Sequence, residues 1–216
     1  MKNALITGAD KGLGYCIAET LGRNGYNVCI NYLKDHNKIN ELCNRLNNNY
    51  DCKVLGYQAN VCHNLELKRM FSFFSEKFGG MDLLINNAGI TKFSPFLKTT
   101  EKLWKEVMFT DFKGAYFCTQ FAAKNMISHK KRGLIINISS NQAQKCWPEA
   151  SVYGSAKAAL SKLGQHAALE LAPYNIIVIT LEPGYVDTGW EHSPALEIIR
   201  KKYHYNVLRH LRKFQK

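Results

Sequence analysis

The chain has 216 residues, which fits one domain, and 46% of them are apolar, enough for a substantial core. No apolar run is long enough to span a membrane. The first strand-like run begins at Ala4, which leaves no room for a signal peptide, and we therefore expect a cytosolic protein. The net charge is +12, and the seven cysteines and seven histidines are scattered without CxxC or clustered spacing, which predicts reduced thiols and no metal site.

Apolar, β-branched runs alternate with segments of helical periodicity along the whole chain. This order predicts right-handed βαβ crossovers, and therefore an α/β fold with a doubly wound, Rossmann-like parallel sheet of about six strands and helices on both faces. No linker or internal repeat is present, so we predict a single domain over residues 1–216. The strands are expected at Asn3–Thr7, Asn27–Tyr32, Lys53–Gln58, Leu83–Asn86, Gly133–Ile138 and Ile176–Leu181. The helices are expected at Gly12–Asn24, Lys38–Asn48, Asn64–Phe78, Glu101–Met108 continuing into Asp111–Ser128, and Ser151–Leu171.

A glycine-rich turn joins the first predicted strand to the first predicted helix. It runs from Thr7 to Gly14 and has Gly8, Gly12 and Gly14 in a GxxxGxG spacing. Glycine permits a tight turn and leaves no Cβ between a helix N-terminus and a pyrophosphate. A glycine cluster alone is often only a turn, but between a strand and a helix at the start of an α/β chain it predicts a dinucleotide site.

The end of the second predicted strand bears on the choice of dinucleotide. An acid there would hold the ribose 2′-hydroxyl of NAD. The chain has Asn31, Tyr32, Leu33 and Lys34 instead, and Lys11 lies in the glycine turn, where it could meet a 2′-phosphate. The alternative is that both lysines are solvated surface residues. We predict NADP(H) in preference to NAD(H).

Tyr153 and Lys157 lie four residues apart in the last predicted helix, a spacing that puts both side chains on one face. A neighbouring ammonium favours the phenolate form of a tyrosine, which can then exchange a proton with an alcohol oxygen. Such a pair on its own is usually an ordinary solvated face, so its meaning depends on the other motifs.

Together, five motifs resemble those of the short-chain dehydrogenases/reductases and follow the order of that family. They are Thr7–Gly14 for TGxxxGxG, Asn86–Gly89 for NNAG, Ser140 at the end of the fifth strand, Tyr153 to Lys157 for YxxxK, and Pro183-Gly184 with Asp187-Thr188 for the PG loop. The likeness covers about residues 2 to 190 and looks closest to the single-domain branch of 3-oxoacyl-acyl-carrier-protein reductases and sugar or alcohol dehydrogenases.

The resemblance implies an NAD(P)-dependent oxidoreductase that transfers a hydride between NADP(H) and a carbonyl or secondary alcohol. Tyr153 would act as acid or base, Lys157 would assist it and hold the nicotinamide ribose, and Ser140 would polarise the substrate oxygen. Asn60 and Val61 would flank the adenine, and Thr188 would meet the nicotinamide amide. The implied cofactor-binding residues are Gly8, Lys11, Gly12, Leu13, Gly14, Tyr32, Asn60, Val61, Asn87, Ala88, Gly89, Tyr153, Lys157, Pro183, Gly184, Val186 and Thr188.

Asp111 is a departure from the family pattern. Relatives usually have an asparagine at this place in the long helix, and its water-bound backbone helps to relay protons to the lysine. The carboxylate of Asp111, if it lies near Lys157, would stabilise the ammonium and alter the charge of the relay. We therefore include Asp111 in the catalytic set and expect reduced or pH-shifted activity.

The second departure is the C-terminus, which looks shortened. The chain ends 32 residues after Gly184, where relatives usually add a substrate-covering helix pair, a seventh strand and a glycine-rich tail. The recurring apolar residues and the basic residues between them predict one basic amphipathic helix over 195–216 that packs over the site or over the sheet edge. Nucleic acid, an anionic membrane or an acidic acyl-carrier protein could bind such a helix, but a solvated basic face is the simpler interpretation.

The missing seventh strand also bears on the oligomeric state. A tetramer that uses this strand is in doubt, and we expect a homodimer, or a larger homo-oligomer, through the Asp111 and Tyr153 helices.

Two hypotheses about function follow. The first is the reductase just described, acting on a small-molecule substrate that Gln142–Glu149 and the segment after Thr188 would contact. The second is a dinucleotide-binding regulator or scaffold with little catalysis, which Asp111 and the short C-terminus favour. The intact Ser140, Tyr153 and Lys157 set favours the first.

Overall fold

A computed structural model describes residues 1–184 and 186, and within it Met1–Pro183 form one compact unit. Six parallel strands form one sheet in the order β3-β2-β1-β4-β5-β6. This sheet confirms the predicted fold class. The strands are β1 (Asn3–Ile6), β2 (Asn27–Tyr32), β3 (Val54–Gln58), β4 (Leu83–Asn86), β5 (Leu134–Ile138) and β6 (Ile177–Leu181).

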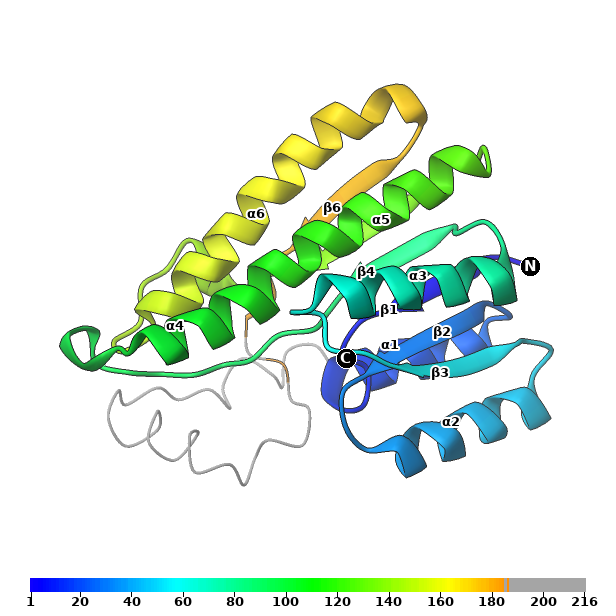
Figure 1. Ribbon diagram of the computed structural model, residues 1–216, viewed down its shortest axis with the longest axis horizontal. Helices are drawn as coiled ribbons and strands as arrows, with labels where there is room; N and C mark the ends of the chain where they lie inside the picture. Colours follow the sequence, from blue (N-terminus) through cyan, green and yellow to red (C-terminus); the bar gives the residue numbers. More distant parts are fainter. Residues whose placement is uncertain (185, 187–216) are drawn as a thin grey trace, which may run out of the picture. The chain divides into compact units, whose positions relative to one another are not determined.

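Helices cover both faces of the sheet. On one face α1 (Gly12–Arg23) and α2 (His36–Asn49) pack on the half formed by β1 to β3. On the other face α3 (Asn64–Phe78), α5 (Ala115–Ser128) and α6 (Ser151–Leu171) lie side by side (Figure 1). The remaining elements are α4 (Glu101–Met108), the π-helical turn η2 (Phe109–Gly114) and the 3₁₀ turns η1 (Phe96–Lys98), η3 (Asn141–Ala143) and η4 (Ala172–Tyr174).

The central strands are apolar on both faces because helices cover both. All four residues of β1 and of β4 are buried. Successive side chains point to opposite faces, so Leu5 packs on the α3 and α5 side while Ala4 and Ile6 pack on the α1 and α2 side. A fully buried side chain such as Phe74 of α3 contributes about 1.5–3 kcal/mol of hydrophobic stabilisation.

The strand order reverses between β1 and β4. The chain builds β1, β2 and β3 in one direction, and then returns to place β4, β5 and β6 on the other side of β1. The loops that leave the carboxyl ends of β1 and β4 therefore diverge, and ligands of doubly wound sheets bind in the crevice that results. Every motif of the predicted site follows the carboxyl end of a strand or lies on a helix next to it.

The strand β6 is an exposed edge of the described sheet, as expected for a chain with no predicted seventh strand, although its apolar sequence resembles that of a buried strand. Ile177, Ile179 and Leu181 are 62%, 43% and 47% exposed on one face, and within the described residues β6 pairs with β5 alone. The helix predicted over 195–216 lies outside the described residues. In the described part of the chain no helix is long and apolar enough to cross a bilayer.

Candidate active site

The glycine turn between β1 and α1 has the backbone that the predicted dinucleotide site requires. Gly8 and Gly12 have φ of +61° and +57°, the left-handed region that glycine adopts at low cost. A Cβ on Gly8 would lie 2.6 Å from the Cα of Ala88, and one on Gly14 would lie 2.9 Å from the carbonyl oxygen of Gly8. The α1 helix begins without a side-chain cap and without an acid in its first turn, so its N-terminus is suited to an anion.

Thr7 and Asn87 join this turn to the loop after β4. The buried Oγ1 of Thr7 accepts hydrogen bonds from the backbone N–H groups of Asn87 (3.0 Å) and Ala88 (3.1 Å). The Asn87 carboxamide donates back to the carbonyl oxygens of Thr7 (3.0 Å) and Gly8 (2.8 Å). The Asn87 carboxamide therefore holds two cofactor-side loops together, and any contact it makes with an adenosine ribose is additional to this structural task.

The end of β2 is tied to the same turn through Asn31, which is 1% exposed. Its carboxamide oxygen accepts from the N–H of Gly8 (3.2 Å), and its nitrogen donates to the carbonyl oxygen of Ala59 (2.9 Å) after β3. Asn31 thus links the ends of three neighbouring strands, β1, β2 and β3.

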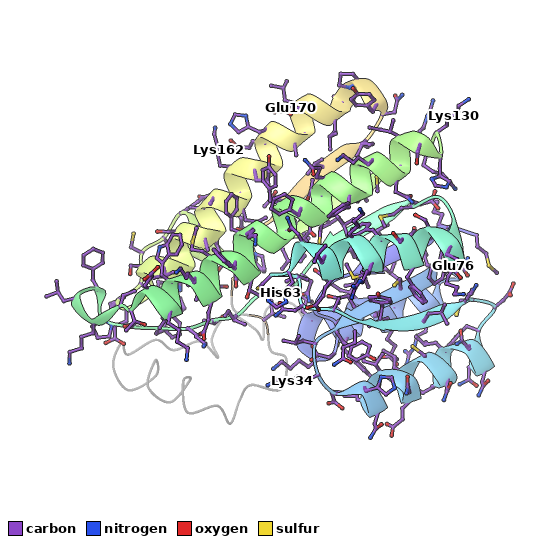
Figure 2. All side chains as sticks on the ribbon, viewed as in Figure 1. Lys34, His63, Glu76, Lys130, Lys162 and Glu170 are labelled. Carbon is purple, nitrogen blue, oxygen red and sulfur yellow. The ribbon has the colours of Figure 1, made fainter. Side chains whose placement is uncertain are left out.

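Tyr32, the last residue of β2, has a buried ring whose hydroxyl is hydrogen-bonded to Nδ1 of His36. Burial raises the pKa of this tyrosine, so it stays protonated and can donate. Lys34 and Lys11 are exposed, and the first carboxylate after β2 is that of Asp35, which has a φ of +52°. Figure 2 shows Lys34 at the end of β2.

Asn60 and Val61, after β3, have roles within the protein. The Asn60 carboxamide oxygen accepts from the N–H of Cys62 (3.0 Å), and the Asn60 N–H donates to Glu66 (2.7 Å), which lowers the pKa of that carboxyl. Val61 is buried against Gly114, where a Cβ would lie 2.9 Å from its Cγ2. The prediction that these two residues flank an adenine stays a prediction.

A π-helical turn places Asp111 at the centre of the site. The expected continuous helix from Glu101 to Ser128 is interrupted here by the six residues of η2, and widened turns of this kind are frequent at functional sites. Asp111 is fully buried, and its Oδ1 accepts from the backbone N–H of Ile90 (2.8 Å) after β4. Gly89 leaves room for it, because a Cβ there would lie 2.9 Å from Oδ2 of Asp111.

Lys157 reaches the same place from α6. Its Nζ donates to the carbonyl oxygen of Ile138 (3.0 Å) at the end of β5 and lies 3.2 Å from Oδ2 of Asp111, although this contact lacks the alignment of a hydrogen bond. The two side chains are 5% and 0% exposed. Burial raises the pKa of Asp111, while the charge of Lys157 and the Ile90 N–H oppose the rise. The sequence analysis considered what would follow if the Asp111 carboxylate lay near Lys157, and in the structure the two groups are in contact.

Tyr153 lies one turn before Lys157 on α6, and the ammonium is 5.6 Å from the centre of its ring. Ser140 follows β5, and its Oγ accepts from the N–H of Gln142 (3.2 Å) as the cap of η3. This turn packs on the start of α6, because a Cβ on Gly154 would lie 3.2 Å from the carbonyl oxygen of Gln142. Asp111, Tyr153, Lys157, Ser140 and Gly89 therefore gather at the carboxyl ends of β4 and β5.

The structure describes only part of the predicted PG loop. The carbonyl oxygen of Pro183 accepts from the N–H of Asn141 (3.0 Å), which ties the PG loop to the segment after Ser140. Gly184 and Val186 are exposed, whereas Thr188 lies outside the described residues. Among the residues that are described, no group of three or more His, Cys, Asp or Glu side chains could hold a metal ion.

Several polar residues shape the site without having been among the residues predicted to bind the cofactor or take part in catalysis. They are Thr7 and Asn31, described above, together with Ser139, Ser161 and Glu182 near Ser140. Their common signal is a polar side chain at the carboxyl end of a buried strand, or on the helix face that packs there. In such a place a polar group requires a partner.

The comparisons with known proteins agree with this geometry. The sequence profile described as short chain dehydrogenase matches residues 2–196, so the chain belongs to the short-chain dehydrogenase/reductase family, whose members are NAD(P)-dependent oxidoreductases.

Individual relatives are similar over most of the chain. A 3-oxoacyl-[acyl-carrier-protein] reductase from Staphylococcus epidermidis is 35% identical over 86% of this chain and 75% of its own length. A 2-dehydro-3-deoxy-D-gluconate 5-dehydrogenase from Formosa agariphila is 34% identical over 87% of this chain and 70% of its own length. The crystal structure of acetoin dehydrogenase from Salmonella typhimurium superposes with a TM-score of 0.82 at 30% identity, covering 87% of this chain and 74% of that one.

Proposed function

We propose that the protein interconverts a carbonyl compound and its secondary alcohol with NADP(H) as cofactor and Tyr153 as the acid–base group. The observation that carries this proposal is the buried ammonium of Lys157, held 5.6 Å from the ring centre of Tyr153 by the Ile138 carbonyl and by Asp111. A buried cation held beside a phenol that can donate or accept a proton is typical of a catalytic site, although its pairing with Asp111 also offsets the cost of its burial.

The proton inventory of Lys157 supports this role. An ammonium has three N–H donors. One donates to the Ile138 carbonyl and one faces Asp111, so the third remains for a ribose hydroxyl or for the phenol oxygen. Beside this positive charge, Tyr153 would take the proton of an alcohol that is oxidised and return it to a carbonyl that is reduced.

Ser140 would complete the oxygen-binding side of the site. Its Oγ accepts a hydrogen bond from the N–H of Gln142 (3.2 Å), which fixes the side chain, and its proton makes a long contact with Oδ1 of Asn141 (3.5 Å), from which it would turn to a substrate oxygen. NADP(H), when bound, supplies or takes up the hydride. The uncapped N-terminus of α1 and the glycine turn fit its pyrophosphate, and Gly8, Gly12, Leu13 and Gly14 would line that contact.

The preference for NADP(H) rests on the charges around the end of β2. Lys11 and Lys34 are exposed, and Tyr32 is hydrogen-bonded to His36, the first residue of α2. Asp35 is the one carboxylate in this segment that could instead favour NAD(H). Fluorescence titration with NADPH and NADH tests the choice. We expect tighter NADPH binding that weakens in Lys34→Ala, and equal affinities would contradict the preference.

A homodimer in the cytosol is the assembly and location that we propose. All seven cysteines are free thiols, as in a reducing compartment. Trp104, Phe109 and Tyr116 are 45%, 36% and 43% exposed along the α4–α5 segment that would form the dimer surface. Sedimentation of the wild type and of Tyr116→Lys tests the dimer, and a monomeric wild type would refute it.

A dinucleotide-binding regulator with little catalysis is the second candidate. The buried Asp111 beside Lys157 favours it, because the carboxylate neutralises the charge that Tyr153 would use. A panel of ketones, aldehydes and 3-oxoacyl thioesters with NADPH or NADH separates the two. Turnover that is lost in Tyr153→Phe supports the oxidoreductase, whereas tight cofactor binding without turnover on any substrate supports the regulator.

A further inference from the structure

Glu182 lies between β6 and the PG loop, and its carboxylate joins two elements that carry the catalytic residues. One oxygen accepts from the side-chain nitrogen of Gln144 (2.6 Å), just after the η3 turn that Ser140 caps. The other accepts from the hydroxyl of Ser161 (2.7 Å), one turn beyond Lys157 on α6. Charge-assisted hydrogen bonds of this kind are shorter and stronger than bonds between neutral groups.

The contact with Ser161 continues inward to the backbone of the catalytic lysine. Ser161 uses its single proton on Glu182, so the Ser139 hydroxyl is the donor between the two serines, whose oxygens are 2.9 Å apart. The same Ser139 hydroxyl lies 2.9 Å from the carbonyl oxygen of Lys157 and shares its proton with that acceptor. Ser139, which is 3% exposed, directly precedes Ser140.

The backbone around Glu182 is also fixed to the backbone around Ser140. The N–H of Ser139 donates to the carbonyl oxygen of Leu181 (2.8 Å), and that of Asn141 donates to the carbonyl oxygen of Pro183 (3.0 Å). These two bonds flank Ser140 on one side and Glu182 on the other. The carboxylate is therefore attached to the same piece of backbone that carries the catalytic serine, and its side chain extends this attachment to Gln144 and to α6.

We propose that Glu182 is a positioning residue for the reaction, which holds the turn of Ser140 and the helix of Tyr153 and Lys157 at a fixed separation. The proposal rests on the proposed function for its kinetic part. Glu182 touches none of the three catalytic side chains in the described structure and acts through Ser139, Ser161 and Gln144. Because hydride and proton transfer depend on the distance between the groups that bind the substrate oxygen, loosening this link lowers turnover without removing a reacting group.

Steady-state kinetics of three variants test the positioning role. Glu182→Ala removes both contacts and is expected to lower kcat/KM for the carbonyl substrate by about 10-fold to 100-fold, with an unchanged NADPH dissociation constant. Gln144→Ala removes only the exposed hydrogen bond to Glu182 and is expected to lower kcat/KM by less. Glu182→Gln is expected to recover most of the activity, since its oxygen can accept from Ser161 while the exposed carboxamide of Gln144 turns to accept from its nitrogen. The matched control is Glu170→Ala, an exposed carboxylate near the other end of α6 (Figure 2), which is expected to match the wild type.

Hydrogen exchange of the cofactor-free protein separates this inference from the proposed function. We expect amide exchange in residues 140–149 to be faster in Glu182→Ala than in the wild type and in Glu170→Ala, with α3 unchanged in all three. Unchanged exchange in this segment overturns the positioning role, as does a Glu182→Ala enzyme with wild-type kcat/KM. If the wild type reduces no carbonyl while exchange responds as expected, the proposed function fails and the structural link remains.

Discussion

Replacing Asp111 with asparagine removes a buried negative charge from the site and keeps the size of the side chain. The carboxamide oxygen can still accept from the Ile90 N–H, which donates to Oδ1 over 2.8 Å, and Lys157 keeps its bond to the Ile138 carbonyl. The contact that is lost is the ion pair of 3.2 Å between Oδ2 and Nζ. The ammonium then acts on the phenol of Tyr153 without a neutralising partner.

The size of the effect follows from the distances. The carboxylate is 3.2 Å from Nζ, and Nζ is 5.6 Å from the ring centre, so the charge lies within about 9 Å of the phenol. At an effective dielectric constant of ~20 to ~40, a unit charge at that distance changes the free energy of phenolate by about 1–2 kcal/mol. A change of this size in the free energy of the proton-transfer step alters the rate by about 5-fold to 30-fold.

The assay is the initial rate of alcohol oxidation over a range of pH, for the wild type, Asp111→Asn and the exposed-aspartate control Asp51→Asn. We expect Asp111→Asn to be faster below the optimum and its profile to move to lower pH, with Asp51→Asn unchanged. Because burial raises the pKa of Asp111, the variants converge at low pH, where this carboxyl is protonated. Superimposable profiles for wild type and Asp111→Asn would refute the reasoning.

Three further predictions concern the scaffold of the site. Gly8→Ala should abolish cofactor binding and destabilise the protein by more than the control Gly25→Ala in urea unfolding. Both have positive φ, which costs alanine about 1–2 kcal/mol, but only at Gly8 does the new Cβ meet backbone, at 2.6 Å. Thr7→Val should lower the free energy of unfolding by about 2–4 kcal/mol, since it deprives two N–H groups of their acceptor, whereas the exposed Thr20→Val should cost less than about 1 kcal/mol. The folded-state pKa of Asp111 is raised, so its contribution to stability is present below the unfolded-state pKa of about 4 and is lost as pH rises through the folded value. Melting of both proteins at several pH values should therefore show Asp111→Asn gaining stability relative to the wild type as pH rises, and a constant difference would contradict the sign.

The sheet and its order of elements could be predicted because burial imposes a simple pattern. Strands covered on both faces read as apolar runs, as in β1 and β4, and the helices between them follow the helical period. The turn at Gly8 could be predicted for a similar reason, since its positive φ and the approach of Ala88 leave no room for another residue.

The π-helical turn and the polar links could not be predicted because they depend on distant partners. The turn at Asp111 brings a carboxylate to Lys157, 46 residues further along the chain; local sequence does not show that pairing, which only the resemblance to the family suggested. Likewise, Asn87 and Asn60 are predicted cofactor contacts, and the structure adds partners within the protein: the Asn87 carboxamide bonds to the glycine turn, and that of Asn60 bonds to Cys62 in its own loop. A polar residue in a loop can form hydrogen bonds to a ligand, to other parts of the protein, or to both, and its partners become known only from the structure.

Transfer of deuterium is the measurement that tests the central claim most directly. The enzyme is supplied with NADPH that is deuterated at both positions of C4, together with the carbonyl compound that the substrate panel identifies, and the alcohol is analysed by mass spectrometry. We predict one deuterium on the carbinol carbon of the product of the wild type, and none from Tyr153→Phe because that variant forms no product. Oxidised cofactor without deuterium in the alcohol would contradict direct hydride transfer, and equal labelling by Tyr153→Phe would contradict the role of Tyr153.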